Sequence, residues 1–127
     1  MRYEDGKYPL PQNLLEKKLG YTFKDPSLLQ SALYHSSYAN ELKSKGVTVQ
    51  CNERLEFFGD SVLSLIVSDY LYFRYVANQE GDMTKIRAAV VCERALAKYA
   101  AKIGLGNYLY LGHGEDINHG RERASIT

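Results

Sequence analysis

One long helical pattern, at residues 52 to about 75, constrains the fold of this chain more than any other feature. At the roughly 100° that an α-helix turns per residue, its apolar side chains fall within about 80° of one another and form a stripe that we expect to be buried. The stripe consists of Leu55, Phe58, Val62, Ile66 and Phe73. Asp69 falls close to this stripe, where a buried hydrogen bond or an interface would account for it.

Helix signals dominate the rest of the chain, whereas the alternation typical of strands is nearly absent. Gly20 and Gly104 are placed to end helices, and Asp25–Pro26 is typical of a helix start. The expected helices cover residues 12–19, a segment from Pro26, 52–75, 83–91 and 93–103, and the expected loops cover residues 41–50 and 106–120. The sequence therefore predicts an all-α fold, and its 127 residues suit a single domain.

The balance of charges limits how this chain can bind other molecules. Its formal net charge is +1, whereas a domain that grips nucleic acid unaided is usually strongly basic. Any such affinity has to come from local patches, a metal ion or another module. No apolar run approaches the roughly 18 residues that span a bilayer, so we expect no membrane association. Cys51 and Cys92 lie far apart, which favours free thiols in a reducing cytoplasm.

The polar side of the long helix carries three carboxylates. Glu53, Glu56 and Asp60 lie within about 60° of one another at the α-helical turn angle, and no lysine or arginine shares their face. Like charges at this spacing destabilise a helix by roughly 0.2–0.5 kcal/mol per pair. Two interpretations stay open, a solvated acidic face or a site for a hard divalent cation. Mg²⁺ prefers carboxylate oxygens, which Glu56 and Asp60 can present from one rigid helix.

Phe57 is the second unusual residue of this helix. It lies about 40° from Glu53 around the helix, on the polar side and away from the apolar stripe. A large aromatic side chain in that position should be covered by something outside its own helix. An interface with another chain and burial under residues 41–50 are the two alternatives.

The long helix resembles the signature of a known family. Residues 53–63, ERLEFFGDSVL, resemble the ERLEFLGDxVL helix of bacterial ribonuclease III, with Phe58 in place of the usual leucine. Four further segments are similar to motifs of the same family, in the same order. They are ALYHSSY at residues 32–38, EGDMTKIRA at 80–88, LGHGE at 111–115 and RERASI at 121–126.

The resemblance implies an all-helical ribonuclease III catalytic domain that cleaves double-stranded RNA with Mg²⁺, or Mn²⁺ as a substitute, in RNA processing such as that of rRNA. By position, Asp60 matches the catalytic aspartate, Glu56 a metal-ligating glutamate, and Glu53 the first glutamate of the signature, beside the RNA. Phe57 matches an aromatic knob that inserts into the partner of a homodimer, and Glu80 an acidic residue near the site. The family leaves 5′-phosphates, 3′-hydroxyls and two-nucleotide 3′ overhangs.

The sequence departs from the family pattern at its C-terminal end. Family members complete the metal site with a D-x-x-E-A motif directly after the segment that here reads Ser125-Ile126-Thr127. A double-stranded-RNA-binding domain customarily follows. Neither is present in these residues, so we expect residues 1–127 to be a C-terminally incomplete nuclease domain that is inactive on its own.

Three other side chains could take part in RNA chemistry. Lys85 and Arg87 are candidate phosphate contacts, although each also fits a solvated helical face. His35 could act as a base, but its place in the ALYHSSY segment favours a histidine fixed by hydrogen bonds in a packed turn. No base-reading constellation is visible, as expected for a protein that recognises duplex RNA by shape.

Two rival functions remain. One is a non-catalytic scaffold of the same fold that binds double-stranded RNA or dimerises. The presence of Glu53, Glu56 and Asp60 together argues against that scaffold, and the lack of a D-x-x-E-A motif argues for it. The other is a generic helical adaptor with an acidic face, which leaves the four further motifs unexplained.

Overall fold

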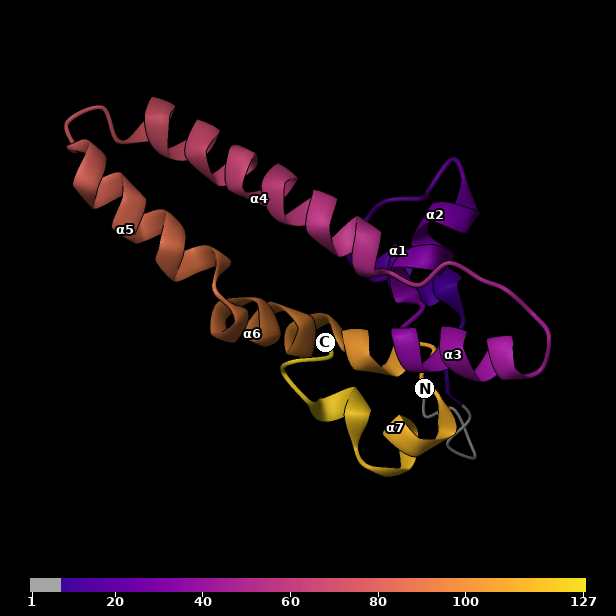
Figure 1. Cartoon of the computed structure of the whole chain (residues 1–127). Coiled ribbons are helices and arrows are strands. Elements are labelled where there is room, and N and C mark those ends of the chain that lie inside the picture. The colour runs from indigo at the N-terminus through magenta and orange to yellow at the C-terminus, as the bar shows by residue number, and fades with distance from the viewer. Residues whose placement is uncertain (1–7) are drawn as a thin grey trace.

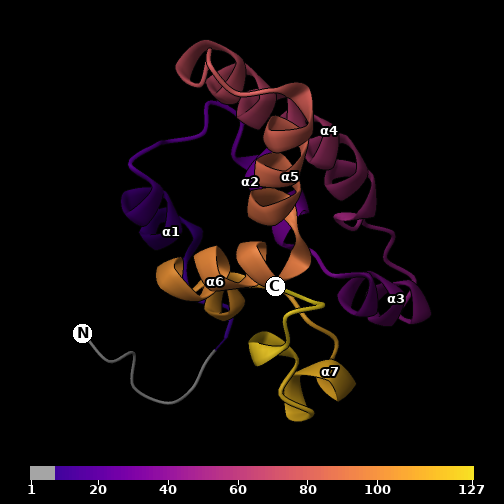
Figure 2. The ribbon, with the colours of Figure 1, turned by 90° about the vertical axis from the view of Figure 1, so that its left-hand side faces the viewer.

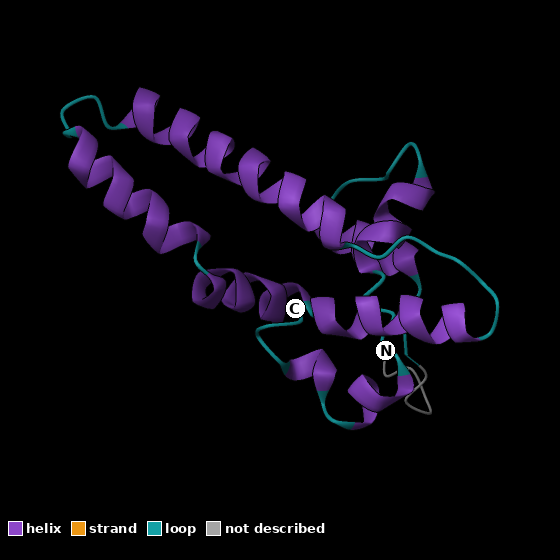
Figure 3. Cartoon of the chain, in the orientation of Figure 1, coloured by secondary structure: helices purple, strands orange, loops and turns teal. Residues whose placement is uncertain are grey.

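The computed structural model describes residues 8–127, which form helices joined by loops and contain no strand (Figure 3). In chain order the elements are α1 (Gln12–Leu19), α2 (Pro26–Leu33), α3 (Ser36–Ser44), α4 (Glu53–Arg74), α5 (Glu80–Val91), α6 (Glu93–Ile103), η1 (Leu105–Tyr108), α7 (His113–Ile117) and η2 (Gly120–Glu122). The predicted all-α class is confirmed. Of the helices in this part, none is both long and apolar enough to cross a membrane.

Local signals account for several helix ends. Gly20 and Gly104 adopt the left-handed conformation, with φ of 67° and 64°, and end α1 and α6 where the sequence predicts. The Asp25 carboxylate accepts a hydrogen bond from the backbone N–H of Ser27 at 3.0 Å, and Pro26 occupies the first position of α2. These helices therefore begin and end for reasons that lie within a few residues of each boundary.

A core of buried residues joins the first third of the chain to a segment near its end. The buried members are Leu15, Leu29, Leu33, Tyr108, Leu109 and Leu111. The backbone of Tyr110 bonds to α2 and its end, donating to Leu33 O at 2.9 Å and accepting from His35 N–H at 3.1 Å. We call α1, α2 and residues 108–111 the body. In Figures 1 and 2, α1 and α2 lie close together and away from the C-terminal end of α4.

The glycine-rich stretch 106–120 was predicted to be a surface loop, and for much of its length that prediction is wrong. It contains η1 and α7, and it places Tyr108, Leu109 and Leu111 in the core. The glycines allow close approach instead of marking exposure. A Cβ on Gly106 would lie 2.0 Å from the carbonyl oxygen of Arg121, and one on Gly112 would lie 2.8 Å from that of Ser37.

Helix α3 was not predicted, because residues 41–50 read as a loop. The helix runs through the first part of that segment to Ser44. The side chain of His35 supplies its N-terminal cap by accepting from the backbone N–H of Ser37. Histidine is not among the preferred capping residues, so the sequence offered no clear start signal there.

Helices α4 and α5 form an antiparallel hairpin that extends away from the body (Figure 1). We call this pair the hairpin. Its predicted buried stripe is exposed in this chain, with 38% of Leu55, 66% of Phe58 and 72% of Phe73 accessible. Val62 and Ile66, the remaining members of the stripe, are 38% and 59% exposed.

The stripe is open because α5 packs on a different face of α4. Leu71 is the buried residue of α4, and it lies about 160° from Leu55 around the helix. Ser64 and Ser68 lie on the same side, where small side chains let α5 approach, and Arg87 Nη1 donates to Ser68 Oγ at 2.8 Å. The apolar stripe therefore faces away from α5.

Candidate active site

The first two turns of α4 present the predicted carboxylates together. Glu53, Glu56 and Asp60 are all exposed, and all three line one cavity of about 740 Å³. The start of α4 is held to the end of α2, because Asn52 donates its backbone N–H to Tyr34 O at 2.8 Å and its side-chain amide to Ala32 O at 3.2 Å. Backbone contacts between two helices thus position the acidic residues.

Two other parts of the chain complete the walls of this cavity. Helix α6 contributes Glu93, Leu96 and Ala97, and residues 124–127 close another side. Glu93 is a fourth carboxylate that the sequence did not predict for the site. Helical spacing could not connect Glu93 with Glu53 or Asp60, because Glu93 lies on a different helix. Helix α6 comes back to the start of α4 only after the chain has returned through α5.

A buried arginine anchors the segment that leads to residues 124–127. The Arg121 side chain is 8% exposed and binds the Asp116 carboxylate through Nε at 2.8 Å and Nη2 at 3.1 Å. Its Nη1 donates to Gly106 O at 2.9 Å. The guanidinium group is thus held by both the Asp116 carboxylate and the Gly106 carbonyl. This restricts the conformations open to the residues that follow Arg121. The wall formed by residues 124–127 is thereby tied to η1 and α7.

The chemistry of the carboxylates suits a hard cation held largely by water. Mg²⁺ is usually bound by one or two protein carboxylates while it keeps several waters, and Glu56 and Asp60 are both accessible and one helical turn apart. Within residues 8–127 the structure gathers no group of three or more His, Cys, Asp or Glu side chains that could hold a metal ion. The residues present therefore fit a weakly held, hydrated ion.

The other predicted site residues lie on the hairpin, away from this cavity. Glu80, Asp69 and Arg87 line a separate cavity of about 460 Å³ between α4 and α5. Arg87 is occupied by Ser68, and Lys85 is exposed on α5. Asp69 is exposed, so it is not the buried hydrogen-bonded group that its helical angle suggested. The structure does not bring Glu80, Lys85 or Arg87 into the cavity of Glu53, Glu56 and Asp60.

Phe57, the residue that follows Glu56, is 81% exposed. Residues 41–50 do not cover it, so that alternative is wrong for this chain. Exposed aromatic side chains beside other exposed apolar groups are typical of interfaces. Phe57 and the open stripe give the hairpin two apolar surfaces without a cover in residues 8–127.

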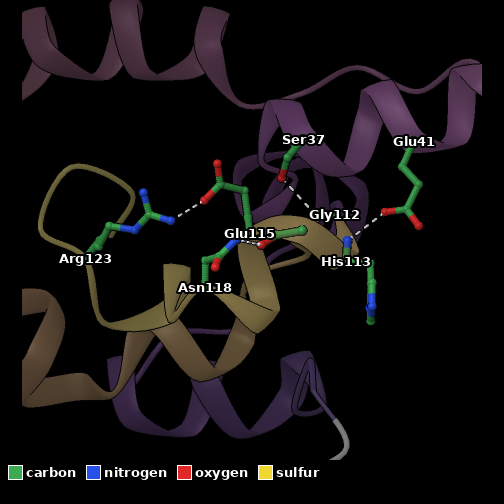
Figure 4. A pocket seen from close by; sticks show the side chains of 8 residues that line it. Ser37, Glu41, Gly112, His113, Glu115, Asn118 and Arg123 are labelled. Carbon is green, nitrogen blue, oxygen red and sulfur yellow. Dashed lines mark hydrogen bonds and ion pairs between the residues drawn. The ribbon is translucent and has the colours of Figure 1, made fainter.

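A corner between α3 and α7 adjoins the site and fixes its histidine. Figure 4 shows Ser37 and Glu41 reaching from α3 towards the start of α7. Ser37 Oγ accepts from the backbone N–H of Gly112 at 2.9 Å, and Glu41 Oε2 accepts from that of His113 at 2.9 Å. Ser37 Oγ also lies 2.8 Å from Nδ1 of His35, which lines the acidic cavity. The predicted packed-turn histidine is confirmed.

Three tyrosines pack on the same corner. Tyr34, Tyr38 and Tyr110 have ring centroids 4.9 to 5.3 Å apart. Burial raises the pKa of Tyr34, and the neighbouring Tyr38 and Tyr110 raise it further. The half-buried rings join α2, α3 and residues 108–111, so they stiffen the frame that carries His35 and the start of α4.

Comparisons with known proteins identify the family. A match to the Ribonuclease-III-like family covers residues 25–127. The chain is 54% identical over 112 residues to Ribonuclease 3 of Caldanaerobacter subterraneus subsp. tengcongensis, covering 88% of this chain and 48% of that protein. It is 50% identical over 111 residues to Ribonuclease 3 of Pseudothermotoga lettingae, covering 87% and 47%. The chain thus spans about half the length of these relatives.

Solved structures show the same likeness in three dimensions. The nuclease domain of ribonuclease III from Campylobacter jejuni superposes with a TM-score of 0.81 at 40% identity, over 91% of this chain and 76% of that one. That structure concerns flexibility in a region involved in dimer formation. A second structure of the same domain gives a TM-score of 0.79 at 41% identity, over 91% and 73%. Motifs, fold and relatives agree, and the chain belongs to the ribonuclease III family.

Proposed function

We propose that this chain forms part of a divalent-metal-dependent endonuclease that cleaves double-stranded RNA in the cytoplasm. The observation that carries the proposal is the meeting of Glu53, Glu56 and Asp60 in one solvent-accessible cavity that His35, between α2 and α3, also lines. Relatives at 50% and 54% identity are named Ribonuclease 3, which supports the same reaction here. The proposed products carry 5′-phosphates, 3′-hydroxyls and two-nucleotide 3′ overhangs.

Each acidic residue has a role in this proposal. Glu56 and Asp60 would hold Mg²⁺, or Mn²⁺ in its place, and Glu53 lies towards the RNA. A bound divalent cation supplies charge stabilisation on the phosphate oxygens and an activated water for hydrolysis. Lys85 is exposed and remains a candidate phosphate contact along the hairpin. The bond from Arg87 to Ser68 favours a structural role for that side chain. Glu80 lies on the hairpin, outside the cavity of Glu53, Glu56 and Asp60, so any contribution to RNA binding would come from there.

We also propose that two copies of the chain associate through the hairpin. Phe57 is 81% exposed on α4 and would act as the expected knob, and the open stripe on the other side of the helix gives a second apolar surface. The Campylobacter jejuni domain has a region involved in dimer formation, which supports association of two copies here. Phe57 and the acidic cavity share the first turns of α4, so association would act close to the site.

A non-catalytic scaffold remains the second candidate. The absence of a metal-holding group of three side chains within residues 8–127 favours it. The inactivity of residues 1–127 alone, expected from the sequence, also stays a prediction. Residues 1–127 alone are therefore assayed for cleavage of a long RNA duplex with Mg²⁺, and we expect them not to cleave it.

The decisive variant is Asp60→Asn, which keeps the shape of the side chain and removes its charge. In the complete protein with Mg²⁺, we expect cleavage of a long RNA duplex to fall about a thousandfold or more, because a catalytic metal contributes several kcal/mol to the transition state. RNA binding, measured by filter retention, should stay nearly unchanged.

Asp69→Asn is the matched control, because Asp69 lies on the same helix but lines the other cavity. It should cleave like the wild type. Equal cleavage rates for Asp60→Asn and the wild type would contradict the proposal, and RNA binding without any cleavage by the wild type would favour the scaffold.

A further inference from the structure

The two ring nitrogens of His35 have different roles. The backbone N–H of Ser37 donates to Nδ1 at 3.2 Å, so Nδ1 is an acceptor. Ser37 Oγ lies 2.8 Å from the same nitrogen and itself accepts from the N–H of Gly112. Its single hydroxyl proton is therefore free to point at Nδ1 as well. In a neutral imidazole whose Nδ1 accepts, the ring hydrogen is on Nε2.

This tautomer limits what His35 can do. Nδ1 cannot take a proton without giving up the cap of α3, and Nε2 already carries its hydrogen. The role of general base that the sequence left open is therefore disfavoured by the hydrogen-bond network. The group that His35 offers to its surroundings is an N–H donor in a fixed orientation.

Nε2 has no protein acceptor in the described part of the chain. No hydrogen bond to this nitrogen is present within residues 8–127. No side-chain nitrogen or oxygen there is both buried and without a partner, so Nε2 is reachable by solvent. His35 lines the same cavity as Glu53, Glu56 and Asp60. An acceptor for this N–H therefore has to come from outside the described residues, either from water or from a ligand that enters that cavity.

The lining of the cavity determines which ligand benefits from such a donor. Within the described chain the lining holds four glutamate and aspartate side chains and no lysine or arginine. One of the two N–H groups of the Asn52 side-chain amide donates to Ala32 O. A phosphodiester entering this cavity would meet repulsion from the carboxylates and few nitrogen donors. A neutral N–H offers a hydrogen bond to an anionic oxygen without competing with a cation for the carboxylates.

We propose that His35 contacts the substrate directly, donating Nε2–H to a non-bridging phosphate oxygen of the bound RNA. The inference rests on the proposed function, since it takes RNA as the ligand of the acidic cavity. The same ring thus has two separable functions. Nδ1 caps α3, and Nε2 binds the phosphate.

Two substitutions separate these functions. In His35→Asn the side-chain oxygen can replace Nδ1 as the cap of α3, because asparagine is among the best capping residues, while nothing replaces Nε2. In His35→Gln the longer amide can place an N–H near the position of Nε2, while the cap is lost. A purely structural histidine would be rescued by asparagine, and a phosphate donor would be rescued by glutamine.

The measurements are thermal unfolding, single-turnover cleavage of an RNA duplex with Mg²⁺, and duplex binding in the Asp60→Asn background. We expect His35→Asn to keep the wild-type unfolding midpoint and to weaken duplex binding by about 10- to 100-fold, the usual effect of losing a hydrogen bond to a charged group. Cleavage at subsaturating RNA should fall at least as much. His35→Gln should lower the midpoint by roughly 2–8 °C and bind at least tenfold more tightly than His35→Asn.

Asp25→Ala is the matched stability control, because Asp25 caps α2 through Ser27 N–H and does not line the cavity. It should lower the midpoint as His35→Gln does and leave duplex binding unchanged. Wild-type binding by His35→Asn would overturn the proposal. If His35→Asn is itself unstable, His35→Gln decides: retained binding supports the phosphate contact, and binding reduced to the level of His35→Asn overturns it.

If the proposed function is wrong, the cleavage assays show it separately from the His35 variants. In that case the wild type would not cut duplex RNA, or Asp60→Asn would cut normally. The binding measurements would still decide the role of His35, since equal duplex affinities for the histidine and asparagine forms would exclude a phosphate contact under either outcome.

Discussion

The body and the hairpin differ in how much of their apolar side chains is exposed. In the body, Leu15, Leu33 and Tyr108 are 1–3% exposed. In the hairpin, Phe57, Phe73 and the nearby Val76 are 72–85% exposed, and Leu71 is the buried residue of α4. Both regions are rich in apolar residues, but the described chain buries several of them together in the body and only Leu71 in the hairpin. The body is thus stabilised by its own core, whereas the hairpin keeps apolar surfaces that the described chain does not cover.

This contrast places the candidate site at a boundary. The carboxylates lie on the first turns of α4, where the hairpin leaves the body, and His35, between α2 and α3, lines the same cavity. The packed region of α2, α3 and residues 108–111 forms one side of the cavity. The other side is formed by α4, which carries uncovered apolar surface. Substitutions on the two sides should therefore affect different measurements.

Phe57→Ala should have the largest effect, and it should change association. Loss of a buried aromatic side chain typically costs about 3–5 kcal/mol, so the complete protein should shift from dimer towards monomer in analytical ultracentrifugation. Lys85→Ala, an exposed change elsewhere on the hairpin, is the control and should leave the dimer unchanged. An unaltered dimer in Phe57→Ala would show that Phe57 is not part of the interface.

Leu33→Ala should have the next largest effect, and it should change folding. Leu33 is 3% exposed in the body, so removing it should lower the free energy of unfolding by about 2–5 kcal/mol. The matched change Phe73→Ala, at a residue 72% exposed in the hairpin, should stay within about 0.5 kcal/mol in the monomer. Urea denaturation of residues 1–127 at low concentration measures both. Equal losses would remove the distinction between body and hairpin.

Arg87→Ala should have a smaller and local effect. It removes the hydrogen bond from the charged Arg87 side chain to Ser68 that joins α5 to α4, a contact worth about 1.5–3 kcal/mol. Amide hydrogen exchange should accelerate in α5 while α1 stays protected. Faster exchange in both helices would mean that the body and the hairpin open together.

The sequence predicted most helix boundaries because their causes are local. Gly20, Gly104 and the Asp25–Pro26 pair act within one turn of the ends that they set. The clustering of Glu53, Glu56 and Asp60 on one side of α4 follows from helical spacing alone. Features of this kind need no knowledge of which elements pack together.

Other features depended on packing that no local pattern records. The apolar stripe of α4 was predicted to be buried, but α5 packs on the face that carries Ser64, Ser68 and Leu71 instead. Residues 106–120 looked like a loop because glycine is common in loops, whereas here Gly106 and Gly112 allow two backbones to touch. Glu93 reaches the site through the return of the chain along α5, and its own sequence context gives no sign of this.

The bond between Ser37 and Gly112 joins residues 75 positions apart, and the whole hairpin lies between them. Contacts of such high sequence separation form slowly, because a long loop must close before they contribute. During synthesis the apolar surfaces of α4 therefore leave the ribosome before the body can assemble. We expect the hairpin to be the segment most prone to aggregation in the nascent chain, and the one that benefits most from early pairing with a second copy.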